Sequence, residues 1–187
     1  MRSRNFAACV AGNTESLNGE TAGMNLTLMP LTERDVRELI AAPQAFAARH
    51  SLILEADACA PAFIYERALL NMQAAPDWAS VLSTRLYVLD GRRVVGGGGV
   101  KAPPTAEGEV EIGYGMAPAW HRRGLGTEAA RGLTIEALAH GASRVVALTR
   151  PDNIASWRLL ERIGYVRDGN GTDPEDGLMW RWVHASA

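Results

Sequence analysis

The sequence has little cysteine and no long apolar run. Only Cys9 and Cys59 occur among its 187 residues, and two cysteines outside any metal-like spacing predict neither a disulfide framework nor a metal site. No apolar run approaches the roughly 18–20 residues that a membrane-spanning helix needs. We therefore expect a protein of the reducing cytoplasm that holds no metal and has no membrane partner.

Lysine is also scarce. Lys101 is the only lysine among the 19 lysine and arginine residues, and the formal net charge is -2. A protein that binds nucleic acid regardless of sequence is distinctly basic, so we expect no nucleic-acid partner. The rest of the composition is ordinary for a globular domain, with 47% hydrophobic and 21% charged residues, and the length fits one domain.

The N-terminal stretch differs from the rest of the chain. Two arginines precede an apolar run at 6–11, which is shorter than the roughly 7–15 residues of a signal-peptide core. We expect residues 1–23 to form a disordered extension and residues 24–187 to form a single domain. Met24 is a candidate for the true start of the chain.

Hydrophobic periodicity predicts a mixed α/β (α+β) fold. Thr32 and Asp35 have the spacing of a capping box at a helix start, and Gly141 and Gly164 stand where helix C-caps belong. Predicted strands cover 26–29, 86–89, 94–101, 110–116, 145–148, 165–167 and 178–183. Predicted helices cover about 32–42, one or two segments within 44–80 (the clearest being 61–73), 124–140 and 153–163. The order predicts a sheet of six or seven strands flanked by about four helices.

The C-terminal third carries two further expectations. Helical spacing in the segment 153–163 directs Ile154, Trp157, Leu160 and Ile163 toward the core. The segment 169–177, between the last two predicted strands, is rich in polar residues and glycine and is predicted to be a loop.

Glycine is concentrated in one part of the chain, between Gly91 and Gly132. The run Gly96–Gly99 removes every side chain from the middle of a predicted strand. Two interpretations stay open for this run. It is either a bulged strand with no room for side chains, or a wall against which a ligand lies.

A basic, glycine-rich turn joins a predicted strand to the helix that begins near Gly124. The first N–H groups of a helix have no partner within the helix, and the helix dipole is positive at that end. Gly124 and Gly126 let an anion approach these groups, and Arg122 and Arg123 add positive charge. The segment therefore predicts a phosphate-binding site.

A dinucleotide is one ligand class for this site. The segment Gly124–Ala129 fits the pattern G-x-G-x-x-A. A dinucleotide fingerprint follows its strand directly and is followed by an acidic residue about 20 positions later. Here residues 118–123 intervene, and Glu136 comes too early. This interpretation is therefore disfavoured.

The same turn resembles the coenzyme A site of the GNAT superfamily of N-acetyltransferases. The segment His121–Gly126 is similar to the signature Q/R-x-x-G-x-G/A, with histidine at the first position instead. Further matches follow in order along the chain, at Glu111-Ile112-Gly113-Tyr114, Thr127-Glu128-Ala129, Asn153-x-x-Ser156 and Ile163-Gly164-Tyr165. These matches resemble the branch of ribosomal-protein N-terminal acetyltransferases. The resemblance extends from about Met24 to the C-terminus.

The resemblance implies acetyl transfer from acetyl-CoA to an amine acceptor. It implies a GNAT-type, largely antiparallel sheet that splays at its central strands. Pantetheine would pair with the exposed backbone there, and Gly113 and Gly115 fit a β-bulge at this point of the strand. The implied cofactor-binding residues are Met116 and Ala117 for pantetheine, then His121, Arg122, Arg123, Gly124, Leu125, Gly126 and Thr127 for the pyrophosphate, and Asn153 for the pantetheine amide. We also keep a homodimer as an expectation.

The acceptor amine must lose a proton before it attacks a thioester. An α-amine has a pKa of about 7.7–8.0 and a lysine about 10.4, so a base or a water chain is needed. Glu109 and Glu111 are the candidates, and their spacing places them on one side of a strand. The resemblance favours Glu111. The alternative, that a free α-amine attacks with little help, stays open.

For the acid that protonates the leaving thiolate, the resemblance implies Ser156. Many relatives carry a tyrosine acid at the position of Leu160, and a leucine there cannot donate a proton. Helix capping is the alternative role for Ser156 and Asn153. The expected function is thus an N-acetyltransferase that acts on a small molecule or a protein N-terminus. The alternative is a non-catalytic acyl-CoA-binding module of the same fold.

Overall fold

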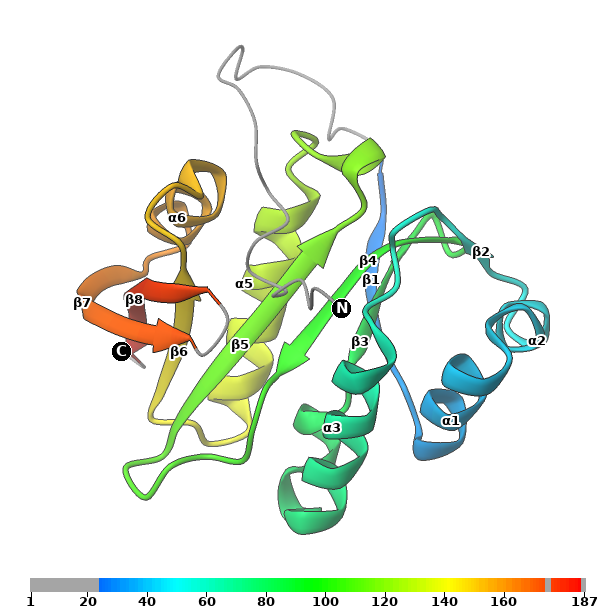
Figure 1. The fold of residues 1–187 in the computed structure, drawn as a ribbon, viewed down its shortest axis with the longest axis horizontal. Coiled ribbons are helices and arrows are strands. Elements are labelled where there is room, and N and C mark those ends of the chain that lie inside the picture. Colours follow the sequence, from blue (N-terminus) through cyan, green and yellow to red (C-terminus); the bar gives the residue numbers. More distant parts are fainter. Residues whose placement is uncertain (1–23, 174–175, 186–187) are drawn as a thin grey trace.

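An eight-stranded, mostly antiparallel sheet with helices on both faces forms the framework of the molecule (Figure 1). The computed structural model describes residues 24–173 and 176–185, so the expectations for residues 1–23 lie outside the described part. In chain order the elements are β1 (Leu26–Pro30), α1 (Glu33–Ala41), α2 (Pro43–Arg49), β2 (Ile53–Leu54), α3 (Ala62–Ala74), η2 (Pro76–Trp78), α4 (Ala79–Leu82), β3 (Arg85–Leu89), β4 (Arg93–Val100), β5 (Glu109–Met116), η3 (Pro118–Trp120), α5 (Leu125–Ala139), β6 (Arg144–Thr149), α6 (Ile154–Arg162), β7 (Val166–Asp173) and β8 (Gly177–Ala185).

The strands follow the order β1-β3-β4-β5-β6-β8-β7, and the two-residue β2 pairs with β4. Neighbouring strands are antiparallel except for β5 with β6 and β2 with β4. The mixed, largely antiparallel sheet is therefore confirmed. The extra strand beyond the predicted six or seven is the short β2, which is too brief to show a period in the sequence.

The two central strands separate after a short paired region. The parallel pairing of β5 with β6 covers only Glu109–Glu111 opposite Arg144–Val146. Beyond this point β5 continues to Met116 and β6 to Thr149 without pairing to each other, and Figure 1 shows the two strands diverging. This divergence is the predicted splay, and we call it the β5–β6 gap.

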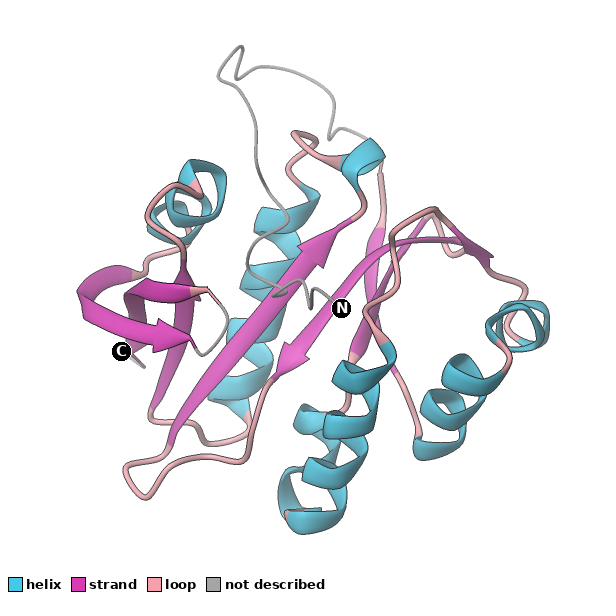
Figure 2. Cartoon of the chain, in the orientation of Figure 1, coloured by secondary structure: helices cyan, strands magenta, loops and turns pink. Residues whose placement is uncertain are grey.

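Helices cover the two faces of the sheet unequally. One core contains the inner faces of α5 and α6 together with Val110, Ile112 and Tyr114 of β5. The other core contains residues of α1, α2 and α3 packed on Leu86 and Val88 of β3. Figure 2 shows α5 behind the central strands, whereas α1 to α3 gather at the β1–β3 side. The α5 stripe is as predicted, because its positions 125, 129, 133 and 137 are all buried.

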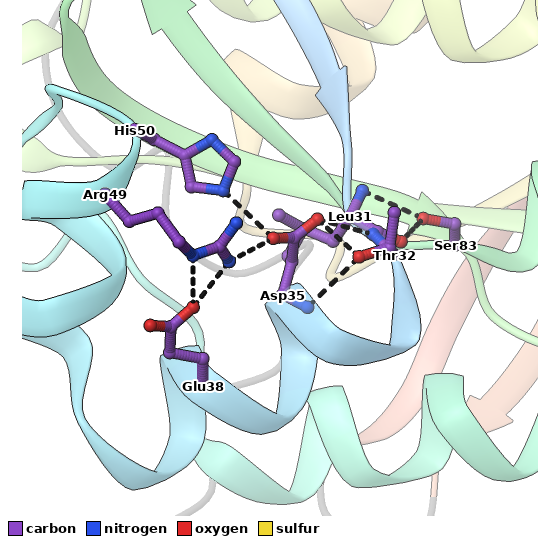
Figure 3. A network of polar contacts seen from close by, with 7 residues as sticks. All are labelled: Leu31, Thr32, Asp35, Glu38, Arg49, His50 and Ser83. Atoms are coloured by element: carbon purple, nitrogen blue, oxygen red, sulfur yellow. Dashed lines mark hydrogen bonds and ion pairs between the residues drawn. The ribbon is translucent and has the colours of Figure 1, made fainter.

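A buried carboxylate connects α1 with the end of α2. Thr32 caps α1, its hydroxyl accepting from Asp35 N while the Asp35 side chain accepts from Thr32 N, so the predicted capping box is confirmed. Figure 3 shows that Arg49 and His50 approach Asp35 from the other side, at 2.5 and 2.9 Å from Oδ1. Burial raises the pKa of Asp35, but the hydrogen bonds from Thr32, Arg49 and His50 outweigh it and hold that pKa well below its usual range.

Three local expectations were wrong. Residues 169–173 belong to β7, because a strand at the sheet edge with solvent on both faces tolerates polar residues, and Gly169 (φ 82°) lies in its irregularity. Ile154 is 49% exposed, since α6 buries Ser156, Leu159 and Leu160 instead. The register of β4 with β5 runs unbroken past Gly113, so the bulge expected there is absent and the irregularity lies between β3 and β4.

Candidate active site

Two backbone hydrogen bonds determine which main-chain groups of β5 face the β5–β6 gap. Lys101 N donates to the Glu111 carbonyl and Ala117 N donates to the Val95 carbonyl, both at 2.8 Å, so these β5 groups point toward β4. Successive residues of a strand direct their main-chain groups to opposite sides. The even-numbered residues 112–116 therefore present N–H and C=O groups to the gap.

The wide end of the gap lies beside Met116 and the loop that follows it. Met116 presents its main chain to the gap, but its carbonyl oxygen already accepts from His121 Nε2 at 3.0 Å. The Ala117 amide is engaged with β4, so Met116 is the member of this pair that faces the gap. His121 thus stands next to the gap and orients the start of the loop.

The loop ends at the N-terminus of α5. Gly124 is the N-cap in the left-handed conformation (φ 76°), and no side chain within the described residues caps this end. Arg122 is also left-handed (φ 60°), and such turns expose successive N–H groups in a concave arrangement. The amide N–H groups of Thr127 and Glu128 donate to the Gly124 carbonyl. The N–H groups before them lie where a helix has no internal acceptor.

Side chains around this helix end are basic and aromatic. The Arg123 guanidinium lies 4.8 Å from the centre of the Trp120 ring, which holds it beside the loop. The buried Trp120 indole N–H has no hydrogen-bond partner in the part of the chain that the structure describes. Leu125 is buried beneath the turn, and Gly126 packs where a Cβ would approach Leu159 at 3.3 Å. The predicted pyrophosphate residues thus lie on this loop and on the first turn of α5.

The two candidate bases lie at the narrow end of the gap, in different environments. Glu111 Oε1 pairs with Lys101 Nζ at 2.5 Å, and both side chains are about one-third exposed. Glu109 is held by two guanidinium groups, those of Arg181 at 2.5 Å and Arg144 at 3.8 Å. Glu111 is the last residue of β5 that is paired with β6, so it stands where the gap begins.

Ser156 is fully buried and shares a hydrogen bond with the Tyr114 hydroxyl at 2.8 Å. Burial raises the pKa of Tyr114, and the hydrogen bond with Ser156 lowers it by less. Asn153 caps α6, and its Oδ1 accepts from Ser156 N at 3.2 Å. The capping role of Asn153 is therefore real, and the pair Tyr114–Ser156 bridges β5 and α6.

The glycine run has a different environment on each face of β4. A Cβ on Gly98 would lie 2.1 Å from the Tyr87 hydroxyl, and one on Gly96 would lie 2.3 Å from the Gly115 carbonyl oxygen. The interpretation that side chains have no room is therefore right for these two positions. Because Tyr87 belongs to the core that includes α5, Gly97 and Gly99 face the other way.

On that opposite face four glycines stand in two directly facing pairs, Gly97 with Gly115 and Gly99 with Gly113. We call this surface the glycine patch. The sheet carries no side chains there, and the next pair along the strands is Lys101 with Glu111. Gly97 and Gly113 are buried, and Gly99 and Gly115 are only partly exposed. The glycine patch is therefore a part of the sheet without side chains beside the candidate base, not an open surface.

Sequence reasoning gave no role to three residues that contact the candidate catalytic groups, namely Lys101, Arg181 and Tyr114. The pairing of Lys101 with Glu111 depends on an irregular connection between β4 and β5. Thr105 N donates to the Glu109 carbonyl, and counting outward from that pair would place Pro103, not Lys101, opposite Glu111. Arg181 reaches Glu109 across the sheet from β8, 72 positions away. No local pattern signals such a contact.

The described residues contain neither a membrane-spanning helix nor a metal-binding cluster. Within residues 24–173 and 176–185, no helix has the length and apolar character that crossing a membrane requires. In the same described ranges, no group of three or more His, Cys, Asp or Glu side chains is arranged to hold a metal ion.

A family model and a curated relative both match this chain. The family model described as the acetyltransferase (GNAT) domain matches residues 25–166. A curated relative from Bacillus subtilis (strain 168), the uncharacterized N-acetyltransferase YjdG, is 35% identical over 78 residues. That match covers 41% of this chain and only 46% of the relative, so it spans about half of the relative's length.

Solved structures share the fold at low identity. The Salmonella typhimurium putative acetyltransferase yncA, determined with its cofactor acetyl-CoA, is 17% identical with a TM-score of 0.59, over 86% of this chain and 94% of that one. A putative ribosomal-protein-serine acetyltransferase from Vibrio cholerae is 16% identical with a TM-score of 0.57, over the same 86% and 94%. With the family model matching most of its length, the chain belongs to the GNAT acetyltransferase family.

Proposed function

We propose that the chain is an acetyl-CoA-dependent N-acetyltransferase that moves an acetyl group to a primary amine of a small molecule or a protein N-terminus. One observation carries this proposal. The β5–β6 gap presents β5 main chain that does not pair with β6, has a glycine-capped helix N-terminus at its wide end and ends at a carboxylate.

The residues present fit acetyl-CoA. A pyrophosphate matches the N–H groups around Gly124 and the nearby Arg122 and Arg123. The unpartnered Trp120 indole N–H is a further donor beside that loop. Pantetheine amides match the gap-facing main-chain groups of residues 112–116, with Met116 at the wide end. Asn153, at the start of α6, is a further proposed contact for a pantetheine amide.

Glu111 is the proposed base, and the amine attacks directly. Glu109 is held by Arg181 and Arg144. Within the described residues Glu111 pairs with Lys101 alone, and it stands where the gap begins. A gap-facing N–H near the end of β5 is suited to donate to the oxyanion of the tetrahedral intermediate. Ser156 is the proposed proton donor to the departing thiolate, and its hydrogen bond with Tyr114 fixes its orientation.

The ribosomal-protein branch is the finer part of the proposal. The ordered motifs Glu111–Tyr114 and Asn153-x-x-Ser156 support it, and it would make a protein α-amine the acceptor. The putative ribosomal-protein-serine acetyltransferase from Vibrio cholerae shares the fold, which is compatible with this branch but does not select it.

One observation favours the alternative function, a non-catalytic acyl-CoA-binding module. The carboxylate of Glu111 and the hydroxyl of Ser156 both have partners within the chain already, Lys101 and Tyr114. A module that only binds its ligand needs neither group to be available.

Thiol release from acetyl-CoA across a panel of amines separates the two functions. We expect turnover with at least one amine class, and Glu111→Gln should lower kcat about 100-fold or more with little change in acetyl-CoA affinity, since general-base catalysis contributes roughly that much. Glu109→Gln is the matched control and should have the smaller effect on kcat. Affinity for acetyl-CoA without thiol release would favour the binding module, and the reverse order of the two variants would transfer the base role to Glu109.

A further inference from the structure

The chain's only lysine stands at its candidate active site. Lys101 is the sole lysine in the sequence, and its Nζ lies 2.5 Å from Glu111 Oε1. Every other long basic side chain is an arginine, whose guanidinium does not act as an acyl acceptor at neutral pH because it stays protonated. The one side-chain amine that this chain can offer to an acyl donor is therefore in contact with the proposed base.

Three contacts fix the position of Lys101. Its N–H donates to the Glu111 carbonyl at 2.8 Å, and its carbonyl accepts from Asn71 Nδ2 of α3 at 2.7 Å. The Nζ contact with Glu111 is the third. The Lys101 side chain is nevertheless 31% exposed, so its amine can be reached from outside.

The surroundings of Lys101 adjoin the path that an acyl donor would take. Glu111 is five residues from Met116, roughly 17 Å along an extended strand at about 3.3 Å per residue. A donor anchored by its phosphates at Gly124 and extended along β5 from Met116 would direct its acyl end toward Glu111 and Lys101. The glycine patch next to Lys101 adds no side chain of its own to this part of the sheet.

We propose that Lys101 is a self-modification site, at which the chain takes an acetyl group from its own bound acetyl-CoA. This inference rests on the proposed function. Lys101 gives one ammonium proton to the Glu111 carboxylate, and its Nζ then attacks the thioester carbonyl carbon. The new C–N bond forms as the C–S bond breaks, the departing thiolate takes the second nitrogen proton to give free coenzyme A thiol, and Glu111 returns its proton to solvent.

The product has a direct electrostatic consequence. An acetylated lysine is a neutral amide and no longer forms an ion pair with a carboxylate. Acetylation of Lys101 therefore releases Glu111 from the contact that occupies it in the unmodified chain.

The test follows acetylation of the Lys101 peptide by mass spectrometry after the full chain is mixed with acetyl-CoA and no other amine. Proteolytic peptides separate Lys101 from the N-terminal amine and from Cys9 and Cys59, and no other side-chain amine competes. We expect the rate to saturate with acetyl-CoA at the dissociation constant that calorimetry gives. We also expect a rate constant that is independent of protein concentration, because the transfer occurs within one chain. Glu111→Gln should slow it, and Gly124→Asp, which places a carboxylate in the phosphate site, should slow it at least tenfold.

The outcomes that overturn the inference are distinct from one another. A rate that rises linearly with acetyl-CoA and is equal in Gly124→Asp would mean chemical acetylation from solution. If Lys101 stays unmodified while the protein binds acetyl-CoA and releases thiol with an external amine, the inference is wrong and the proposed function stands. Absence of acetyl-CoA binding by calorimetry would overturn both. Saturation and concentration independence are measured on the unaltered protein, so they do not depend on how any variant folds.

Discussion

The carboxylate of Asp35 shows how a single residue can join two helices. It is 4% exposed and accepts hydrogen bonds from Thr32, Arg49 and His50 (Figure 3). These donors favour its ionised form and hold its pKa below the usual value despite burial. A carboxyl group whose pKa is lower in the folded than in the unfolded state stabilises the fold when ionised.

This arrangement predicts a pH-dependent contribution to stability. Because the pKa of Asp35 is lowered, its contribution is fully present above the unfolded pKa of about 3.9 and is lost as the pH falls below that value. Asp35→Asn should lower the free energy of unfolding at pH 7 by about 2 kcal/mol, from weaker charge-assisted hydrogen bonds and a weakened cap. Denaturant titrations at several pH values measure the difference.

Asp152→Asn is the matched control for Asp35→Asn. Asp152 also pairs with an arginine, Arg150, but its side chain is 67% exposed, and exposed pairs contribute little. A difference between wild type and Asp35→Asn that stays constant from pH 7 to pH 3 would contradict the account.

At the scale of single residues, the sequence predicts contacts that are local. The Thr32–Asp35 cap follows from their spacing, and Asn153 is recognisable as a cap for the same reason. Arg49 and His50 were not predicted as partners of Asp35 because they come from another helix, 14 and 15 positions away. The contact of Arg181 with Glu109 depends on the sheet order, which no local pattern contains.

Among the elements, β4 is the one whose sequence is most constrained by its neighbours. Gly98→Ala should lower the free energy of unfolding by about 3 kcal/mol, because overpacking of this kind typically costs 1–3 kcal/mol and one obstacle is backbone. Its Cβ would lie 2.1 Å from the Tyr87 hydroxyl and 2.4 Å from the Gly113 carbonyl oxygen. Denaturant midpoints at unchanged slope measure this cost.

Gly99→Ala is the matched substitution on the same strand. Its Cβ would meet Ser83 O and Thr84 Cα at 3.5 Å, which is ordinary contact, so stability should change little. Equal midpoints for the Gly98 and Gly99 variants would show that the close approach of β4 to β5 is relaxed in solution.

The attachment of α5 to β3 depends on one buried cation. Arg85 is 2% exposed and pairs with Glu136 of α5 at 2.5 Å. Glu136→Ala would leave this guanidinium without its carboxylate and should cost about 2 kcal/mol, less than a fully buried pair because Glu136 is itself 41% exposed. Arg131→Ala, on the exposed side of the same helix, should have almost no effect. Thermal unfolding measures both, and a similar loss in the two variants would refute the role of the pair.

The elements that the sequence predicts best are those with a strong period and clear ends. The α5 stripe and the buried β6 are examples. The two-residue β2 has no period. The polar end of β7 has the composition of a loop, because an edge strand needs no apolar face. Ile154 is the first residue of α6, and its side chain is exposed although the helical spacing predicts it to be buried.

At the scale of the whole molecule, the position of the gap was predicted from the resemblance of short motifs and not from periodicity. The motifs that carried it lie on β5, on the α5 turn and on α6, and the structure brings them to one region around the β5–β6 gap. Which glutamate acts, and on which amine, depends on long-range contacts that these motifs do not encode. The homodimer and the cytoplasmic location stay predictions.

The central claim is that the α5 N-terminus and the β5–β6 gap together bind acetyl-CoA. Calorimetric titration of the full chain with acetyl-CoA tests it most directly, on wild type, Gly124→Asp and Gly91→Asp. Gly124 and Gly91 have similar left-handed backbones, with φ of 76° and 67°, so the two variants carry the same new charge and a similar backbone cost. The account predicts binding by wild type and Gly91→Asp and its loss in Gly124→Asp. Undiminished binding by Gly124→Asp, or no binding by wild type, would contradict it.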